Sequence, residues 1–181
     1  MHIAVIARVL GMLLMIFSLT MLSPIIVSSI YEENTSSMFV LAFAITLLVG
    51  LTFWLPTKSH QGELRTRDGF VVTVFFWLVL SGFGSLPLML SEATNLTFID
   101  ALFESVSGLT TTGATVLSGL DDLPKSILYY RQQLQWLGGI GIVVIAVAIL
   151  PMLGIGGMQI YRAETPGPVK DSKLTPRIAE T

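Results

Sequence analysis

Stretches without charged residues dominate this chain and alternate with short polar segments. Four of them contain no Asp, Glu, Lys or Arg, namely residues 9–31, 34–57, 69–91 and 132–161. Each is long enough to supply the roughly 20 residues with which an α-helix crosses a hydrocarbon core about 30 Å thick. The pattern predicts four membrane-spanning helices, at about residues 3–29, 38–55, 69–90 and 128–160. Pro24 fits a helix end or a kink in the first of them.

The segment between the third and fourth predicted crossings departs from this pattern. A shorter helix is predicted at about residues 97–108, with apolar positions at Phe98, Ile99, Leu102, Phe103 and Val106. Thr97 suits the N-cap, and Asp100 in the first turn suits the positive end of the helix dipole. At 1.5 Å per residue such a helix is only about 15–18 Å long and cannot cross the membrane.

Small and hydroxyl-bearing residues follow this short helix directly. The chain reads SGLTTTGATVLSG over residues 107–119, and a polar loop with Asp121, Asp122, Pro124 and Lys125 comes next. The sequence therefore predicts a half-membrane helix that ends in an irregular segment, before the last apolar helix begins.

The composition agrees with a membrane protein. The 181 residues are 52% hydrophobic and 12% charged, with a mean hydropathy of +0.77, whereas a soluble domain carries roughly 25% charged residues. The sequence has no cysteine, which excludes thiol catalysis, disulfides and zinc–thiolate sites. Because no basic patch interleaves with aromatic residues, we expect no nucleic-acid partner. We expect an all-α integral membrane protein in the lipid bilayer.

The distribution of Lys and Arg predicts the orientation. The loop 57–68 carries three such residues and the tail 161–181 carries four, while the turn 31–37 has none and the segment 91–127 has one. By the positive-inside rule, the N-terminus, the loop 57–68 and the tail are cytoplasmic. The short helix and its threonine-rich segment then enter and leave the membrane from outside, as a re-entrant loop.

A re-entrant loop needs a physical reason, because irregular backbone at membrane depth is tolerated only where protein buries it or where it lines a watery cavity. The backbone carbonyls of Thr110, Thr111, Thr112 and Gly113 can replace the water shell of a dehydrated cation, as those of potassium-channel filters do. Gly113 gives the backbone the freedom to aim them, including φ > 0. The short helix adds the partial negative charge of its C-terminal end.

The sequence thus predicts a selectivity filter at residues 110–114, with a monovalent cation held by the carbonyls of Thr111 and Thr112. The alternatives are a packing element between helices, for which small residues also serve, and an ordinary extracellular loop. A membrane scaffold or assembly subunit whose TTTG loop only packs is therefore the rival functional class.

Three segments carry a resemblance to a known family. FESVSGLTTTGAT, YYRQQLQWLGGIGIVV and AETPGPVKDSKLTPRIAET, in this order, resemble the Trk/Ktr/HKT superfamily of potassium transporters. The resemblance covers nearly the whole chain and is strongest over residues 103–181. It implies potassium transport through a pore that four non-identical helix–pore-loop–helix repeats enclose. Position by position, Thr110, Thr111, Thr112 and Gly113 fall on the filter, with Gly113 on its signature glycine.

The resemblance also implies partners and a location. It implies assembly as a homodimer and binding to a cytosolic nucleotide-binding regulatory ring of the TrkA type. That ring, rather than this chain, would bind ATP, ADP or NAD, so potassium as substrate is the only small molecule expected here. The location implied is the bacterial cytoplasmic (inner) membrane.

The domain organisation follows from the same resemblance. Residues 1–57 are expected to form a two-helix N-terminal extension, 58–164 the first pore repeat, and 165–181 a cytoplasmic linker toward three remaining repeats. A single repeat would line a quarter of a pore. We therefore expect either a part of a longer chain, which we favour, or an assembly of several copies.

Two further features are candidates for a role in transport. Glu104 lies within the short helix, where we expect it to support the filter from behind by accepting hydrogen bonds from loop N–H groups. A cation-attracting charge at the outer mouth and an ion pair with Arg131 are the alternatives. The uncharged run 132–161 is longer than the bilayer requires, and Pro151 and Gly154 mark a predicted bend, either a gating hinge or a static kink.

Enzymatic functions are disfavoured. Gly138-Gly139-Ile140-Gly141 lacks the third glycine of a G-x-G-x-x-G motif and any βαβ context, so close helix packing or a hinge is the better interpretation. No cluster of His, Cys, Asp or Glu at membrane depth suggests a catalytic centre. We expect a protein that is not an enzyme.

Overall fold

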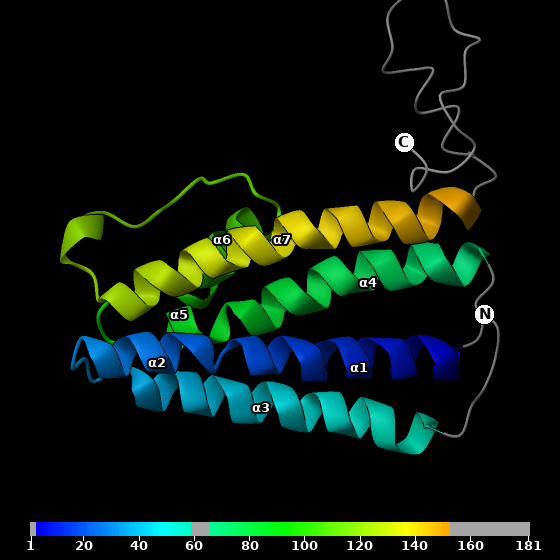
Figure 1. Cartoon of the computed structure of the whole chain (residues 1–181), viewed down its shortest axis with the longest axis horizontal. Coiled ribbons are helices and arrows are strands. Elements are labelled where there is room, and N and C mark those ends of the chain that lie inside the picture. Colours follow the sequence, from blue (N-terminus) through cyan, green and yellow to red (C-terminus); the bar gives the residue numbers. More distant parts are fainter. Residues whose placement is uncertain (1–2, 59–65, 153–181) are drawn as a thin grey trace, which may run out of the picture.

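The computed structural model describes residues 3–58 and 66–152 (Figure 1). This described part is helical and contains no strand, as predicted. Its α-helices are α1 (Ile3–Thr20), α2 (Ser23–Ile30), α3 (Ser36–Trp54), α4 (Thr66–Gly84), α5 (Leu86–Leu90), α6 (Phe98–Leu109) and α7 (Lys125–Met152). Two 3₁₀ turns, η1 (Leu55–Thr57) and η2 (Leu120–Asp122), complete it.

The long helices lie side by side along the long dimension of the molecule (Figure 1). α1 packs against α3 on one side and α4 on the other, and α4 also contacts α7. The short helix α6 packs against both α4 and α7. After α6, the irregular segment returns alongside α7 toward the N-terminal end of that helix (Figure 1).

Three segments within the described residues are long and apolar enough to cross a membrane, namely Ile3–Ile30, Ser36–Thr57 and Asp68–Leu90. They match the first three predicted crossings. The fourth corresponds to α7, which begins at Lys125 rather than at residue 128 and is described as far as Met152. The remainder of that predicted crossing, including Gly154, lies outside the described residues.

The first and third crossings are broken helices. α2 begins with Pro24 in its first turn, and α5 begins with Pro87 in its first turn. Proline lacks an N–H, and its ring clashes with the carbonyl four residues earlier. The expected helix end or kink at Pro24 is confirmed. The span predicted at residues 69–90 is present as Asp68–Leu90, but it consists of two helices, α4 and α5, with Pro87 in the first turn of the second.

α7 supplies hydrogen bonds to both breaks. The carbonyl oxygen of Thr20, at the end of α1, accepts a hydrogen bond from Gln133 Nε2 at 2.9 Å. The carbonyl oxygen of Gly84, at the end of α4, accepts one from Tyr130 Oη at 2.9 Å. Backbone groups freed inside a bilayer need such internal partners. α7 is therefore tied to both broken helices by polar contacts.

Small residues and one aromatic pair set the packing distances. α1 and α3 meet at Gly11 and Gly50, where a Cβ on Gly11 would lie 2.8 Å from the Gly50 carbonyl oxygen. Small residues allow transmembrane helices this close approach. Phe39 and Tyr130 are fully buried and pack edge to face, with ring centroids 5.5 Å apart. They join α3 to α7 in the core.

Candidate functional site

α6 begins with the N-cap that its sequence predicts. Thr97 has extended backbone angles, and its Oγ1 accepts a hydrogen bond from the Asp100 N–H at 3.3 Å. The same hydroxyl donates to the Asp100 carboxylate at 2.6 Å. Thr97 therefore caps the helix start, and the Asp100 carboxylate in the first turn interacts favourably with the helix dipole.

α6 ends in a Schellman motif built on a threonine. The Thr111 N–H donates to the Gly108 carbonyl and the Thr112 N–H donates to the Ser107 carbonyl, each at 2.9 Å. Thr111 holds the left-handed position of this motif, with φ of 56°. Glycine usually occupies that position, and a β-branched residue there is a genuine outlier. Such a residue stores strain of about 1–3 kcal/mol, which the surrounding contacts must offset.

Within the part of the chain that the structure describes, the backbone N–H groups of residues 110–113 form hydrogen bonds, whereas the backbone carbonyl oxygens of these residues do not. The Gly113 N–H also turns back to the Ser107 carbonyl, at 3.3 Å, and Gly113 has φ of 75°. Among the described residues, no hydrogen bond ends on the carbonyl oxygens of Thr110, Thr111, Thr112 or Gly113. The N–H groups of residues 110–113 are thus paired with α6, whereas the carbonyls of the same residues are left as acceptors.

The threonine hydroxyls stabilise this conformation locally. Thr110 Oγ1 lies 2.8 Å from the Val106 carbonyl oxygen, to which it can donate, and 2.8 Å from Thr112 Oγ1. On the far side of the segment, Ser107 Oγ donates to the Ala114 carbonyl at 2.7 Å. Residues 110–113 are exposed in this chain. The segment is therefore held by α6 and leaves one side uncovered.

α7 approaches the end of α6 at a glycine. A Cβ on Gly138 would lie 1.9 Å from the Leu109 carbonyl oxygen, and one on Gly108 would lie 3.0 Å from Leu134 Cβ. Only the absence of a side chain allows the first contact. The close-packing interpretation of Gly138 is confirmed, whereas Gly139 has nothing within 4 Å of its Cβ position.

Glu104 joins α6, the loop and α7. Its Oε1 accepts hydrogen bonds from the Thr115 hydroxyl at 2.5 Å and the Val116 N–H at 2.7 Å. Its Oε2 pairs with Arg131 Nε at 3.0 Å. The side chains of Glu104 and Arg131 are only 2% and 12% exposed. The loop N–H contact expected from the sequence and the Arg131 pair offered as an alternative are therefore both present.

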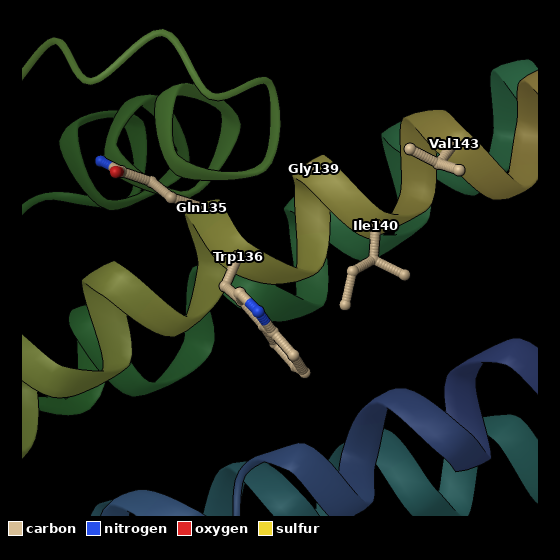
Figure 2. Close-up of a pocket in the computed structure, with 5 residues that line it drawn as sticks. All are labelled: Gln135, Trp136, Gly139, Ile140 and Val143. Carbon is tan, nitrogen blue, oxygen red and sulfur yellow. The ribbon is translucent and has the colours of Figure 1, made fainter.

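A surface hollow of about 400 Å³ lies along α7 next to the loop, lined by Gln135, Trp136, Gly139, Ile140 and Val143. Figure 2 shows the Gln135 side chain directed toward the irregular segment after α6, whereas Trp136 and Ile140 point away from it. A Cβ on Gly113 would lie 3.9 Å from Gln135 Nε2. The polar end of the hollow thus borders the loop glycine.

Comparison with known families assigns the chain. The sequence profile of the TrkH family, described as "Cation transport protein", matches residues 35–181. The chain belongs to the TrkH family. This membership agrees with the resemblance found in the sequence and with the expectation of a transport protein rather than an enzyme.

Individual TrkH-family proteins are similar over the whole chain. The Trk system potassium uptake protein TrkH of Halomonas elongata is 61% identical over 181 residues, which are 100% of this chain and 38% of that protein. The Escherichia coli (strain K12) protein of the same name is 55% identical over 181 residues, which are again 100% of this chain and 38% of that protein. This chain therefore spans well under half the length of these relatives.

A solved TrkH-family structure has the same fold. The crystal structure of the potassium transporter TrkH from Vibrio parahaemolyticus superposes with a TM-score of 0.82 at 49% identity. The match covers 99% of this chain and 35% of that one. The helical arrangement described here is therefore similar to that of the corresponding third of that transporter structure.

Sequence reasoning missed three polar residues that position the site within this TrkH-family chain. Tyr130 and Gln133 bond the two helix breaks, and Glu33 contacts the start of α7 from a distant turn. A signal was present for Gln133, since polar side chains inside an apolar run are costly unless they find a partner. The described residues hold no group of three His, Cys, Asp or Glu that could bind a metal.

Proposed function

We propose that this chain supplies one quarter of the selectivity filter and pore of a potassium-transporting membrane protein. The observation that carries the proposal is the unequal pairing of the backbone groups of residues 110–113. Their N–H groups are used by α6, and their carbonyl oxygens have no partner among the described residues. Oxygen atoms in this state are the ligands with which a filter replaces the water shell of a potassium ion.

In this proposal Thr110, Thr111, Thr112 and Gly113 form the filter segment, and the carbonyls of Thr111 and Thr112 bind potassium. The left-handed conformations at Thr111 and Gly113 support this role, because they reverse the chain direction directly after α6. The C-terminal end of α6 adds a partial negative charge below the segment, which favours a cation there.

The membrane arrangement is part of the same proposal. The three candidate spans and α7 cross the bilayer, and α6 with residues 110–114 re-enters from the outer side. With 12 residues, α6 is about 18 Å long and too short to cross. The N-terminus and the tail then lie on the cytoplasmic side of the bacterial inner membrane.

The division of the chain follows from this arrangement. Residues 1–57 form the two-helix extension, 58–164 the first pore repeat, and 165–181 a linker. The remaining three repeats complete the pore. We also propose assembly as a homodimer with a cytosolic nucleotide-binding ring, and a bend of α7 near Pro151 and Gly154 during gating. The names of the relatives, Trk system potassium uptake proteins, support the ion and the system.

Glu104 supports the filter in this scheme. Its carboxylate fixes the two residues that follow the filter segment, Thr115 and Val116, to α6, and Arg131 fixes that carboxylate to α7. Both charges are nearly buried, so each needs the other. The pair therefore fixes the residues that directly follow the filter segment between α6 and α7.

Ion flux tests the proposal against the scaffold alternative. The complete protein, with all pore repeats present, is reconstituted into vesicles and uptake of potassium or ⁸⁶Rb⁺ is measured. We expect uptake that sodium competes with poorly. Absence of cation flux from a correctly folded and inserted protein would instead support the scaffold function, in which the TTTG loop only packs.

A further inference from the structure

A carboxylate from the turn between α2 and α3 lies at the N-terminal end of α7. Glu33 Oε1 accepts a hydrogen bond from the Lys125 N–H at 2.5 Å. Glu33 Oε2 accepts from the Ser126 N–H at 3.1 Å and from the Ser126 hydroxyl at 2.6 Å. One side chain therefore pairs with two backbone N–H groups of a helix that begins more than 90 residues later.

These contacts have the chemistry of a helix cap. The first N–H groups of an α-helix have no partner within the helix, and a carboxylate there interacts favourably with the dipole. A cap residue ordinarily precedes its own helix directly. Here the residue before α7 is Pro124, and the capping carboxylate comes from a different part of the chain.

Hydroxyl groups fix the turn that carries Glu33. Ser28 Oγ donates to the Glu33 carbonyl at 2.8 Å and is itself bonded by Thr35 and Ser36, at 2.9 and 3.0 Å. Thr35 Oγ1 also lies 2.7 Å from Ser126 Oγ. Ser28 and Ser126 are fully buried. The cap is therefore part of a dense polar network between the two segments.

The charge of Glu33 is maintained by these contacts. Partial burial opposes ionisation, but the hydrogen bonds from Ser126 and Lys125 and the nearby Lys125 charge outweigh it and lower the pKa of Glu33 below its usual 4.5. The carboxylate is thus ionised at neutral pH, the form in which it is the better acceptor.

The start of α7 is connected to the filter segment through the same helix. Arg131 lies on α7 less than two turns beyond Ser126 and binds Glu104, which holds Thr115 and Val116. A shift or rotation of the first turns of α7 would move Arg131 relative to Glu104. The register of α7 is therefore one determinant of where the filter segment ends.

We propose that Glu33 is a positioning residue for the filter, through which the N-terminal two-helix extension fixes α7 and hence the Arg131–Glu104 pair. The inference rests on the proposed filter function and adds a role for the extension. The TrkH-family match begins at residue 35, so α1, α2 and Glu33 precede the matched segment.

The test compares Glu33→Gln with Glu32→Gln in the complete protein. Glu32 is exposed and neighbours Glu33 in the same turn, so both variants remove one charge from the same place. ⁸⁶Rb⁺ uptake gives KM and Vmax, competition gives the potassium-to-sodium preference, and thermal unfolding gives stability. We expect Glu33→Gln to raise KM about fivefold. This is the factor that corresponds to the free energy of one lost helix cap, if all of that free energy appears as weaker ion binding. Its preference for potassium falls, and Glu32→Gln stays near wild type.

A second variant separates position from charge. Ser126→Ala keeps Glu33 charged but removes one of its hydrogen bonds, and it should raise KM in the same direction. It also replaces Glu33→Gln if that variant does not fold. Equal effects of Glu32→Gln and Glu33→Gln, or lower stability with unchanged KM and selectivity, would overturn the inference. If the wild-type protein itself transports no rubidium, the proposed function fails instead.

Discussion

Gly138 of α7 lies directly against the carbonyl of Leu109, the last residue of α6. A Cβ at position 138 would be 1.9 Å from that oxygen, and the segment that we propose as the filter begins at the next residue, Thr110. A backbone atom cannot move away as a flexible side chain can. The distance between α6 and α7 at this point is therefore set by the absence of a side chain.

We predict that Gly138→Ala forces α6 and α7 apart and destabilises the protein by about 1–3 kcal/mol, the usual range for overpacking. It should also reduce the preference for potassium, because the displaced backbone leads into the filter segment. Gly139→Ala is the matched control, since nothing lies within 4 Å of its Cβ position. Thermal unfolding and ion competition on both variants check this. Equal behaviour of the two would contradict the packing explanation.

Removal of the Glu104 charge should strongly reduce both the stability of the protein and its affinity for potassium. In Glu104→Gln the Arg131 guanidinium, only 12% exposed, stays buried without its counter-charge, and breaking a buried pair in this way costs about 3–5 kcal/mol. We expect low protein levels, and weak potassium affinity in the protein that remains. Glu92→Gln, at an exposed position before α6, removes the same charge and should have little effect. Unchanged potassium affinity and selectivity in Glu104→Gln would exclude a filter role for this residue.

Acid should remove the stabilisation that Glu33 provides. Because hydrogen bonds lower its pKa in the folded protein, the unfolded chain binds a proton more readily than the folded one. The contribution is therefore fully present above the unfolded pKa of about 4.5 and is lost as the pH falls through the lower folded value. The difference in unfolding temperature between wild type and Glu33→Gln should shrink below pH 4.5. A difference that grows with acidity would contradict this sign.

Hydrophobic patterning was sufficient to place the three candidate spans and the short helix α6. The spans and the short helix followed from charge-free stretches and apolar periodicity, and the cap at Thr97 followed from its position before Asp100. Pro24 signalled one helix break. The equivalent break at Pro87 was overlooked, because that proline lies near the predicted end of its span.

The contact between Glu33 and the start of α7 was beyond the sequence alone, although the Glu104–Arg131 pair was among the alternatives that the sequence offered. Glu33 and Lys125 meet only because the turn before α3 packs beside the start of α7, and a single sequence gives no sign of such a pair. The left-handed conformation of Thr111 was also unforeseen, since a β-branched residue disfavours it. Tertiary packing, rather than local preference, decides both features.

The central claim is that Gly113 belongs to a potassium filter, and a pair of glycine variants tests it most directly. Gly113 and Gly119 both have positive φ, 75° and 63°, and both lie in the segment after α6. Serine at either position therefore meets similar backbone strain, but only Gly113 lies in the proposed filter. The measurement is the potassium-to-sodium preference of ⁸⁶Rb⁺ uptake by the complete protein. We predict that Gly113→Ser lowers this preference at least tenfold, about 1.4 kcal/mol, and that Gly119→Ser leaves it unchanged. An unaltered preference in Gly113→Ser, in protein that still transports, would contradict the account.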